Sequence, residues 1–169
     1  MIISSKPQRP APDSTWVIHT DGATYGSNPS MIGSGGFTVW CNGLFYHGET
    51  HQQMDTTNNQ IEFFALLRAL SWAHKRDFKH IEVRCDSDLV VKAMADEAKL
   101  KHPDILRLAG GCKSFLQFHT INVEWVSRDE EKQRFTDFVA KLGLDSEVVI
   151  DTRALHEITI EAFYKLYPV

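Results

Sequence analysis

Alternating apolar and polar positions predict strands in the first third of the chain. They favour three strands, at residues 16–20, 37–41 and 44–49, the last of which can extend to Gln52. Asn42-Gly43 separates the second strand from the third and is the strongest short signal for a hairpin. Residues 22–36 contain five glycines and Asn28-Pro29, which predicts a loop between the first strand and the second.

Apolar residues then recur at helical spacing from Ile61 to His74. Thr57, followed three residues later by Gln60, fits a capping box, so we expect the helix to begin there. Nearly every face of this segment is apolar, which is typical of a helix that is buried on most sides.

The second half of the chain alternates strands with helices. Residues 81–85 and 121–125 alternate in polarity and predict strands. Helices are expected after Ser87, after Pro103 as far as about Phe118, and from Glu130 to Leu142, where Gly143 follows as a stop signal. Three initial strands followed by this alternation predict an α/β protein with a mixed sheet and helices packed on it.

The two ends of the chain are expected to lie outside this body. Residues 1–14 contain three prolines and no apolar core of a signal peptide, so we expect a flexible leader. Residues 146–169 carry Leu155, Ile158, Ala162, Phe163 and Leu166 at helical spacing, which predicts a C-terminal helical extension. An apolar stripe on a terminal helix is usually buried, so we expect it to dock on the body or on a protein partner.

Composition narrows the class of protein. The 169 residues are 43% apolar and 24% charged, which is typical of an ordinary globular domain. No apolar run approaches the roughly 20 residues that span a bilayer. Cys41, Cys85 and Cys112 form no C-x-x-C pair, so neither a disulfide framework nor a zinc ribbon is expected, and a cytoplasmic location is predicted. The net charge of −4 argues against binding nucleic acid through bulk positive charge.

One carboxylate, that of Glu62, lies at a position where burial of its charge would cost free energy. Glu62 begins a helical stripe that continues with Leu66, Ala69 and Ala73, all of them apolar. Burying a lone carboxylate costs several kcal/mol or shifts its pKa. Glu62 is therefore either a metal ligand or acid–base group, or a glutamate at the rim that the helix dipole favours.

Three aspartates can join Glu62. Asp21 and Asp86 each follow a strand, and Asp137 lies in the last predicted helix. Considered alone, Asp21 also fits a turn residue, Asp86 a helix N-cap and Asp137 a solvated residue on a helix. Strand ends meet at one edge of a sheet, so the acids can converge, and converging carboxylates need cations among them. Oxygen ligands favour Mg²⁺ or Mn²⁺, and two such ions about 3.5–4 Å apart are a known arrangement for cleaving phosphodiesters.

Four motifs follow one another between residues 15 and 143. They are Thr20-Asp21-Gly22-Ala23 with Asn28-Pro29 and Gly33-x-Gly35-Gly36, then Thr57-Asn58-Asn59-Gln60-Ile61-Glu62, Cys85-Asp86-Ser87 and Asp137-x-x-Ala140. Taken in this order, they resemble the motifs of type 1 ribonuclease H, and Trp125-Val126 resembles the strand before the last of them.

This resemblance implies a five-stranded mixed sheet flanked by helices, over a catalytic domain at residues 15–145. It implies an endonuclease that hydrolyses the RNA strand of RNA/DNA hybrids and leaves 5′-phosphate and 3′-hydroxyl ends. It further implies that Asp21 bridges two Mg²⁺ ions, with Mn²⁺ as a substitute, while Glu62 and Asp86 hold one ion and Asp137 the other.

The resemblance also implies contacts with the substrate. Asn28, Asn58 and Asn59 match positions that touch the duplex in the minor groove, and Thr57 matches a position that helps to bind a DNA phosphate. Arg128 is a further candidate, in a loop where many relatives carry a histidine and this chain has none. We expect a monomer that binds RNA/DNA hybrid and no membrane.

The sequence also departs from the family pattern. Gln133 stands where relatives often have Asn, Asp88 stands where they often have Gln, and no basic protrusion lies between Met94 and Pro103. With the net charge of −4, these differences predict weak, salt-sensitive binding of the substrate. They leave open a nuclease that cuts double-stranded RNA or DNA, or a non-catalytic accessory domain of a polymerase complex that docks through the C-terminal helix.

Overall fold

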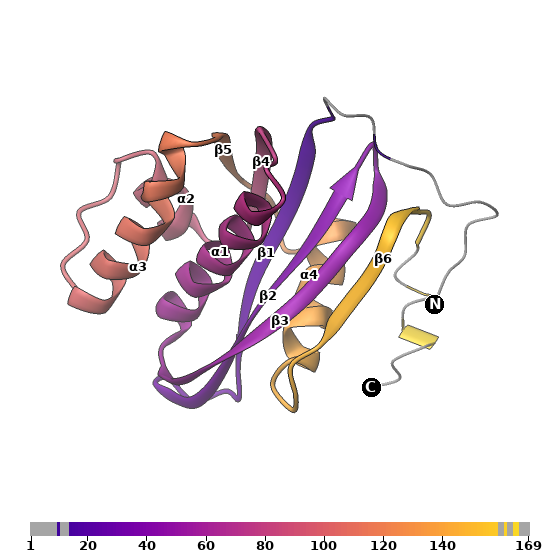
Figure 1. The fold of residues 1–169 in the computed structure, drawn as a ribbon. Coiled ribbons are helices and arrows are strands. Elements are labelled where there is room, and N and C mark those ends of the chain that lie inside the picture. The colour runs from indigo at the N-terminus through magenta and orange to yellow at the C-terminus, as the bar shows by residue number, and fades with distance from the viewer. Residues whose placement is uncertain (1–9, 11–13, 159–160, 162–163, 166–169) are drawn as a thin grey trace.

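A six-stranded sheet forms the centre of the protein, in the order β5-β4-β1-β2-β3-β6 (Figure 1). The computed structural model describes residues 10, 14–158, 161, 164 and 165. The strands are β1 (Trp16–Thr24), β2 (Ser30–Cys41), β3 (Leu44–Thr56), β4 (His80–Cys85), β5 (Thr120–Trp125) and β6 (Val149–His156). β1, β2, β3 and β6 pair antiparallel in turn, whereas β4 pairs parallel with β1 and with β5. The predicted mixed sheet is therefore confirmed, with one strand more than expected.

Helices cover both faces of this sheet. Figure 1 shows α1 in front of the central strands and α4 behind them. α1 contacts α3 and the three central antiparallel strands, and α2 packs on α3 and β5. The helices are α1 (Asn58–Lys75), α2 (Asp88–Met94), α3 (Pro103–Ser114), the 3₁₀ turn η1 (Phe115–Gln117) and α4 (Glu131–Leu142). None of the helices in the described part of the chain is long and apolar enough to cross a membrane.

The local signals for the hairpin and for the start of α1 are confirmed. Asn42 and Gly43 both have positive φ, 53° and 76°, as the turn between β2 and β3 requires. The Thr57 hydroxyl accepts a hydrogen bond from the Gln60 amide, and the Gln60 side chain accepts one from the Thr57 amide. This reciprocal cap fixes the point at which β3 turns into α1.

The loop expected over residues 22–36 is wrong for most of its length, because β1 continues to Thr24 and β2 begins at Ser30. Four of the five glycines here lie in strands and are packing residues, whereas Gly26, with a φ of 85°, is a turn residue between β1 and β2. A Cβ atom on Gly35 would lie 3.0 Å from the Ala65 Cα of α1, and one on Gly36 would lie 2.9 Å from the Ala140 Cα of α4. The glycines therefore let a helix lie against each face of the same strand.

The predicted helical extension is wrong over residues 149–156, which form β6 and pair with β3. Ile150 and Leu155 are buried there. Without β6, the edge of β3 would present unpaired backbone groups, a long-range demand that side-chain spacing does not reveal. Glu161, Tyr164 and Lys165 are helical. The leader predicted over residues 1–14 lies outside the described residues except at 10 and 14.

Candidate active site

Asp21 lies within β1, between two helices. It is buried and pairs with Gly36 of β2, the position against which α4 packs. The Gly22 amide donates to Asp21 Oδ1 at 2.9 Å and to Glu62 Oε1 at 3.1 Å. A Cβ atom on Gly22 would come within 2.5 Å of Ile61. Gly22 therefore lets the first turn of α1 bring Glu62 directly over β1.

Glu62 and Asp86 complete a three-carboxylate cluster with Asp21. One side-chain oxygen from each of the three residues lies within 4.8 Å of the other two. Asp86 follows β4, and the Trp125 indole donates a hydrogen bond to its backbone carbonyl at 3.2 Å. The carboxylates that the sequence analysis picked out from three separate segments therefore meet at one place.

Asp137, on α4, lines the same pocket as Asp21, Glu62 and Asp86, but it is not part of their three-residue cluster. Its side chain is 41% exposed, and Lys141 Nζ lies 2.8 Å from Asp137 Oδ2. This hydrogen bond raises the pKa of Lys141 above its ordinary value. Asp137 therefore stands at the rim, held by a lysine one helical turn further on.

The cluster is electrostatically strained. Burial, followed by the charges of Glu62, Asp86 and Asp137, raises the pKa of Asp21 well above its ordinary value. Burial and the charge of Asp86 raise the pKa of Glu62 to about 8. Burial also raises the pKa of Asp86, against the opposing charge of Arg128. Because close carboxylates disfavour one another's ionisation, Asp21 and Glu62 retain a proton between them at neutral pH.

These residues fit a hard divalent cation. Glu62 Oε2 is buried and has no hydrogen-bond partner among the described residues, so it is available as a ligand. The donors are carboxylate oxygens, the ligands that Mg²⁺ and Mn²⁺ prefer. They line a pocket of about 480 Å³, hereafter the acidic pocket. A cation here would replace the proton and relieve the repulsion.

The candidate substrate contacts divide into two groups. Asn58, Asn59 and Arg128 line the acidic pocket, and Arg128 Nε lies 3.8 Å from Asp86 Oδ2. Asn28 and Thr57 support this rim instead, because Asn28 Oδ1 accepts a hydrogen bond from the Asn58 amide and Thr57 caps α1.

The sequence analysis missed two residues at this site. Lys141 lines the acidic pocket beside Asp137, and its spacing of four residues from an aspartate on a helix is a signal that could have identified it. Trp125 positions the backbone of Asp86, a contact between β5 and β4 that only the sheet register reveals.

Gln133 connects the two elements that carry Asp21 and Asp137. It is fully buried, and its amide donates to the Thr20 carbonyl at 3.0 Å. Its side-chain oxygen lies 2.9 Å from Nδ1 of His19, a residue whose pKa burial lowers to about 4. His19 is therefore neutral, and the side-chain amide of Gln133 joins α4 to β1 through both its nitrogen and its oxygen.

The chain is similar to a known protein family and to a curated protein. The model of a family described as reverse transcriptase-like matches residues 19–142. The bifunctional protein Rv2228c of Mycobacterium tuberculosis is 33% identical over 132 residues, which are 77% of this chain and 35% of that protein. This chain therefore spans about a third of the length of that relative.

Two solved structures share the fold. The N-terminal RNase H domain of Rv2228c has a TM-score of 0.71 at 32% identity, over 79% of this chain and 95% of that one. RNase H1 from Halobacterium salinarum has a TM-score of 0.71 at 28% identity, over 78% of this chain and 98% of that one.

A third solved structure contains a nucleic acid. LC11-RNase H1, in complex with an RNA/DNA hybrid, has a TM-score of 0.69 at 26% identity, over 77% of this chain and 96% of that one.

Proposed function

The chain belongs to the reverse transcriptase-like family of RNase H-like domains, and on this basis we propose that it is an endonuclease that hydrolyses the RNA strand of RNA/DNA hybrids. The observation that carries the proposal is the cluster of Asp21, Glu62 and Asp86, whose oxygens lie within 4.8 Å of one another. The hybrid seen with LC11-RNase H1 supports the choice of substrate.

The carboxylates are proposed to hold two divalent cations, Mg²⁺ or Mn²⁺. Asp21 would contribute to both ions, Glu62 and Asp86 to one, and Asp137 to the other. When bound, such ions supply an activated water and neutralise charge on the leaving oxygen. Bound ions would favour the ionised carboxylates, so Asp21 and Glu62 would give up the proton that they share.

The reaction exchanges one bond to phosphorus for another. The oxygen of a water molecule bonds to the phosphorus, and the bond from phosphorus to the 3′ oxygen breaks. The attacking water gives up one proton and the leaving 3′ oxygen gains one, so one water is consumed and the products carry 5′-phosphate and 3′-hydroxyl ends. Arg128 and Lys141 bring positive charge to the rim of the acidic pocket, where the scissile phosphate would lie.

The rim of the acidic pocket is proposed to recognise the hybrid. The amides of Asn28, Asn58 and Asn59 can both donate to and accept from 2′-hydroxyls, which distinguish the RNA strand from DNA. Thr57 is proposed to assist at a phosphate of the DNA strand while it caps α1. With a net charge of −4, binding should be weak and should fall steeply with salt.

The setting of the reaction is also part of the proposal. Cys41, Cys85 and Cys112 are all buried and unpaired, which fits a reducing, cytoplasmic compartment. We propose a monomer in which residues 15–145 form the catalytic unit. A protein partner is proposed to dock on the segment that follows β6, because residues 149–156 are already paired with β3.

An activity assay on three labelled duplexes tests the proposal. With Mg²⁺, we expect cleavage of the RNA strand in RNA/DNA hybrid and none of double-stranded DNA or RNA. Cleavage of either other duplex instead would support a nuclease of different specificity. If no duplex is cut and the Asp21→Asn variant behaves like the wild type, a non-catalytic accessory role would replace the enzyme proposal.

A further inference from the structure

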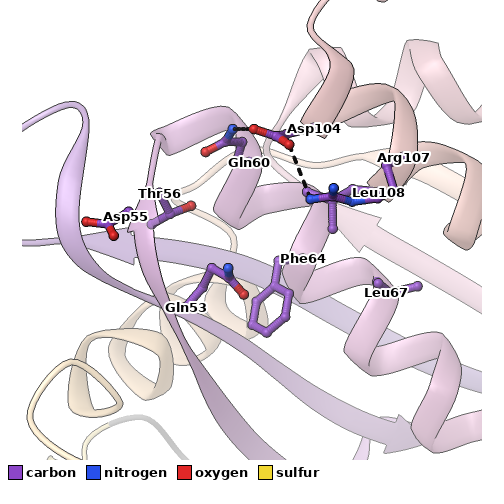
Figure 2. Close-up of a pocket in the computed structure, with 9 residues that line it drawn as sticks. All are labelled: Gln53, Asp55, Thr56, Gln60, Phe64, Leu67, Asp104, Arg107 and Leu108. Atoms are coloured by element: carbon purple, nitrogen blue, oxygen red, sulfur yellow. Dashed lines mark hydrogen bonds and ion pairs between the residues drawn. The ribbon is translucent and has the colours of Figure 1, made fainter.

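A second cleft lies on the other side of the start of α1. It has a volume of about 210 Å³ and lies between the end of β3, α1 and α3, and we call it the α1–α3 cleft (Figure 2). Gln60, Phe64 and Leu67 face it from one side of α1, whereas Asn58, Asn59 and Glu62 of the same helix face the acidic pocket. A nucleic acid at the acidic pocket would therefore have this cleft within reach across the first turns of one helix.

The α1–α3 cleft has an apolar floor and an amide rim. Phe64 and Leu67 of α1 and Leu108 of α3 form the apolar part, and all three are only partly buried. Figure 2 shows the Phe64 ring between the Gln53 amide and Leu67, with Gln60 above it. A flat apolar surface and two amides, each of which donates and accepts, are the groups that bind the face and the edge of a nucleobase.

The charges in the α1–α3 cleft argue against a phosphate. Arg107 is the one cation among the residues that line it, and its guanidinium already lies 3.2 Å from Asp104 Oδ1. The other oxygen of Asp104 accepts a hydrogen bond from the Gln60 amide at 3.2 Å. Asp55 adds a further carboxylate at the rim. A neutral, planar ligand fits this lining, and an anion does not.

We propose that the α1–α3 cleft binds one unpaired nucleobase, with Phe64 as the stacking surface and Gln53 as a partner for the base edge. The base would come from a single-stranded extension of a nucleic acid whose duplex part lies at the acidic pocket, and in this respect the inference rests on the proposed function. Paired bases cannot enter, because their faces are stacked and their edges are occupied. The α1–α3 cleft would thereby favour duplexes next to a single-stranded end.

Binding assays with matched duplexes test this inference. Hybrids carry a two-nucleotide extension at one of their four strand ends, and each has a twin whose extension is abasic. Binding is measured with Mg²⁺ in the Asp21→Asn background, so that no strand is cut. For at least one end, the base-bearing hybrid should bind at least about fivefold more tightly than its abasic twin, as stacking of one base on an aromatic ring allows.

Substitutions in the α1–α3 cleft test whether this preference for a base-bearing extension arises there. Gln53→Leu, at an exposed position, and Phe64→Leu should each reduce the preference, while Gln117→Leu, an exposed residue outside the cleft, should retain it. A preference that survives both cleft substitutions would overturn the inference, because the base would then bind elsewhere.

A titration without any duplex separates this inference from the proposed function. Adenosine and uridine, which carry a base but no phosphate, are added while the side-chain amide signals of Gln53 and Gln60 are followed by NMR. Shifts at these amides, lost in Phe64→Leu, would support base binding and identify free nucleosides as a second source. No shift, together with equal binding of all the twin hybrids, would overturn the inference. If no hybrid binds at all, the proposed function fails, and this titration alone decides the inference.

Discussion

The repulsion among the carboxylates predicts that removing one of them stabilises the metal-free protein. Glu62→Gln keeps the shape of the side chain and its acceptor for the Gly22 amide but cannot ionise. Glu62 has an ordinary pKa of 4.5, which the fold raises to about 8. Between these two values the folded state holds a proton that the unfolded state has released. The free energy of unfolding of the wild type therefore falls as pH rises from 4.5 to 8.

The size of this effect follows from the two pKa values. At pH 7 the wild type has a free energy of unfolding lower by about 3 kcal/mol than a protein in which residue 62 stays neutral, and at pH 5 it is lower by about 1 kcal/mol. These are upper bounds, because Asp21 shares the proton. For a chain of this length, about 1 kcal/mol corresponds to roughly 2–4 °C in Tm. We therefore expect Glu62→Gln to raise the Tm at pH 7 by several degrees, and by less at pH 5.

Thermal unfolding followed by circular dichroism in EDTA, at pH 5, 7 and 8, measures this difference. Glu97→Gln, an exposed acid outside the acidic pocket, is the matched control and should leave the Tm nearly unchanged. Adding Mg²⁺ should raise the Tm of the wild type more than that of Glu62→Gln, since the variant loses a ligand. A variant less stable than the wild type at pH 7 in EDTA would refute the account of the cluster, because Glu62 would then be a structural residue.

Three further outcomes are expected. Asp21→Asn should abolish Mg²⁺-dependent cleavage of hybrid while the fold, checked by circular dichroism, remains; full activity would reject its assignment as a ligand. Asp137→Asn should weaken activation by Mg²⁺ in a metal titration, and an unchanged titration curve would remove Asp137 from the site. Burial opposes ionisation of Glu49, but hydrogen bonds from His47 and His51 lower the pKa of Glu49 to about 2. The stabilisation that Glu49 contributes to the folded state is present above pH 4.5 and is lost as pH falls toward 2. Glu49→Gln should accordingly flatten the loss of Tm over this range, and parallel curves would exclude the effect.

Local chemistry made much of the fold predictable from the sequence. The Asn42-Gly43 turn and the reciprocal cap of Thr57 with Gln60 are interactions between residues close in the chain, and both formed as expected. The helix that carries Glu62 followed from its apolar periodicity. Predictions were reliable where the deciding contact lies within a few residues.

Long-range packing decided the features that the sequence analysis got wrong. Gly35 and Gly36 are strand residues whose missing side chains let α1 and α4 pack closely on β2. Nothing within residues 22–36 reveals those two helices, which come from distant segments. β6 forms because the edge of β3 needs a partner, although Leu155 and Ile158 have helical spacing. Likewise, the position of Asp137 and Lys141 at the rim of the acidic pocket depends on where α4 packs against the sheet, although the ion pair between them is local to the helix.

Crystals soaked with Mn²⁺ would test the central claim most directly, since the anomalous scattering of manganese locates the ion. We expect a peak bound by Asp21, Glu62 and Asp86 and, with a hybrid bound, a second peak next to Asp137. Crystals that hold a hybrid and show no anomalous peak in the acidic pocket would contradict the claim that these carboxylates are a cation site.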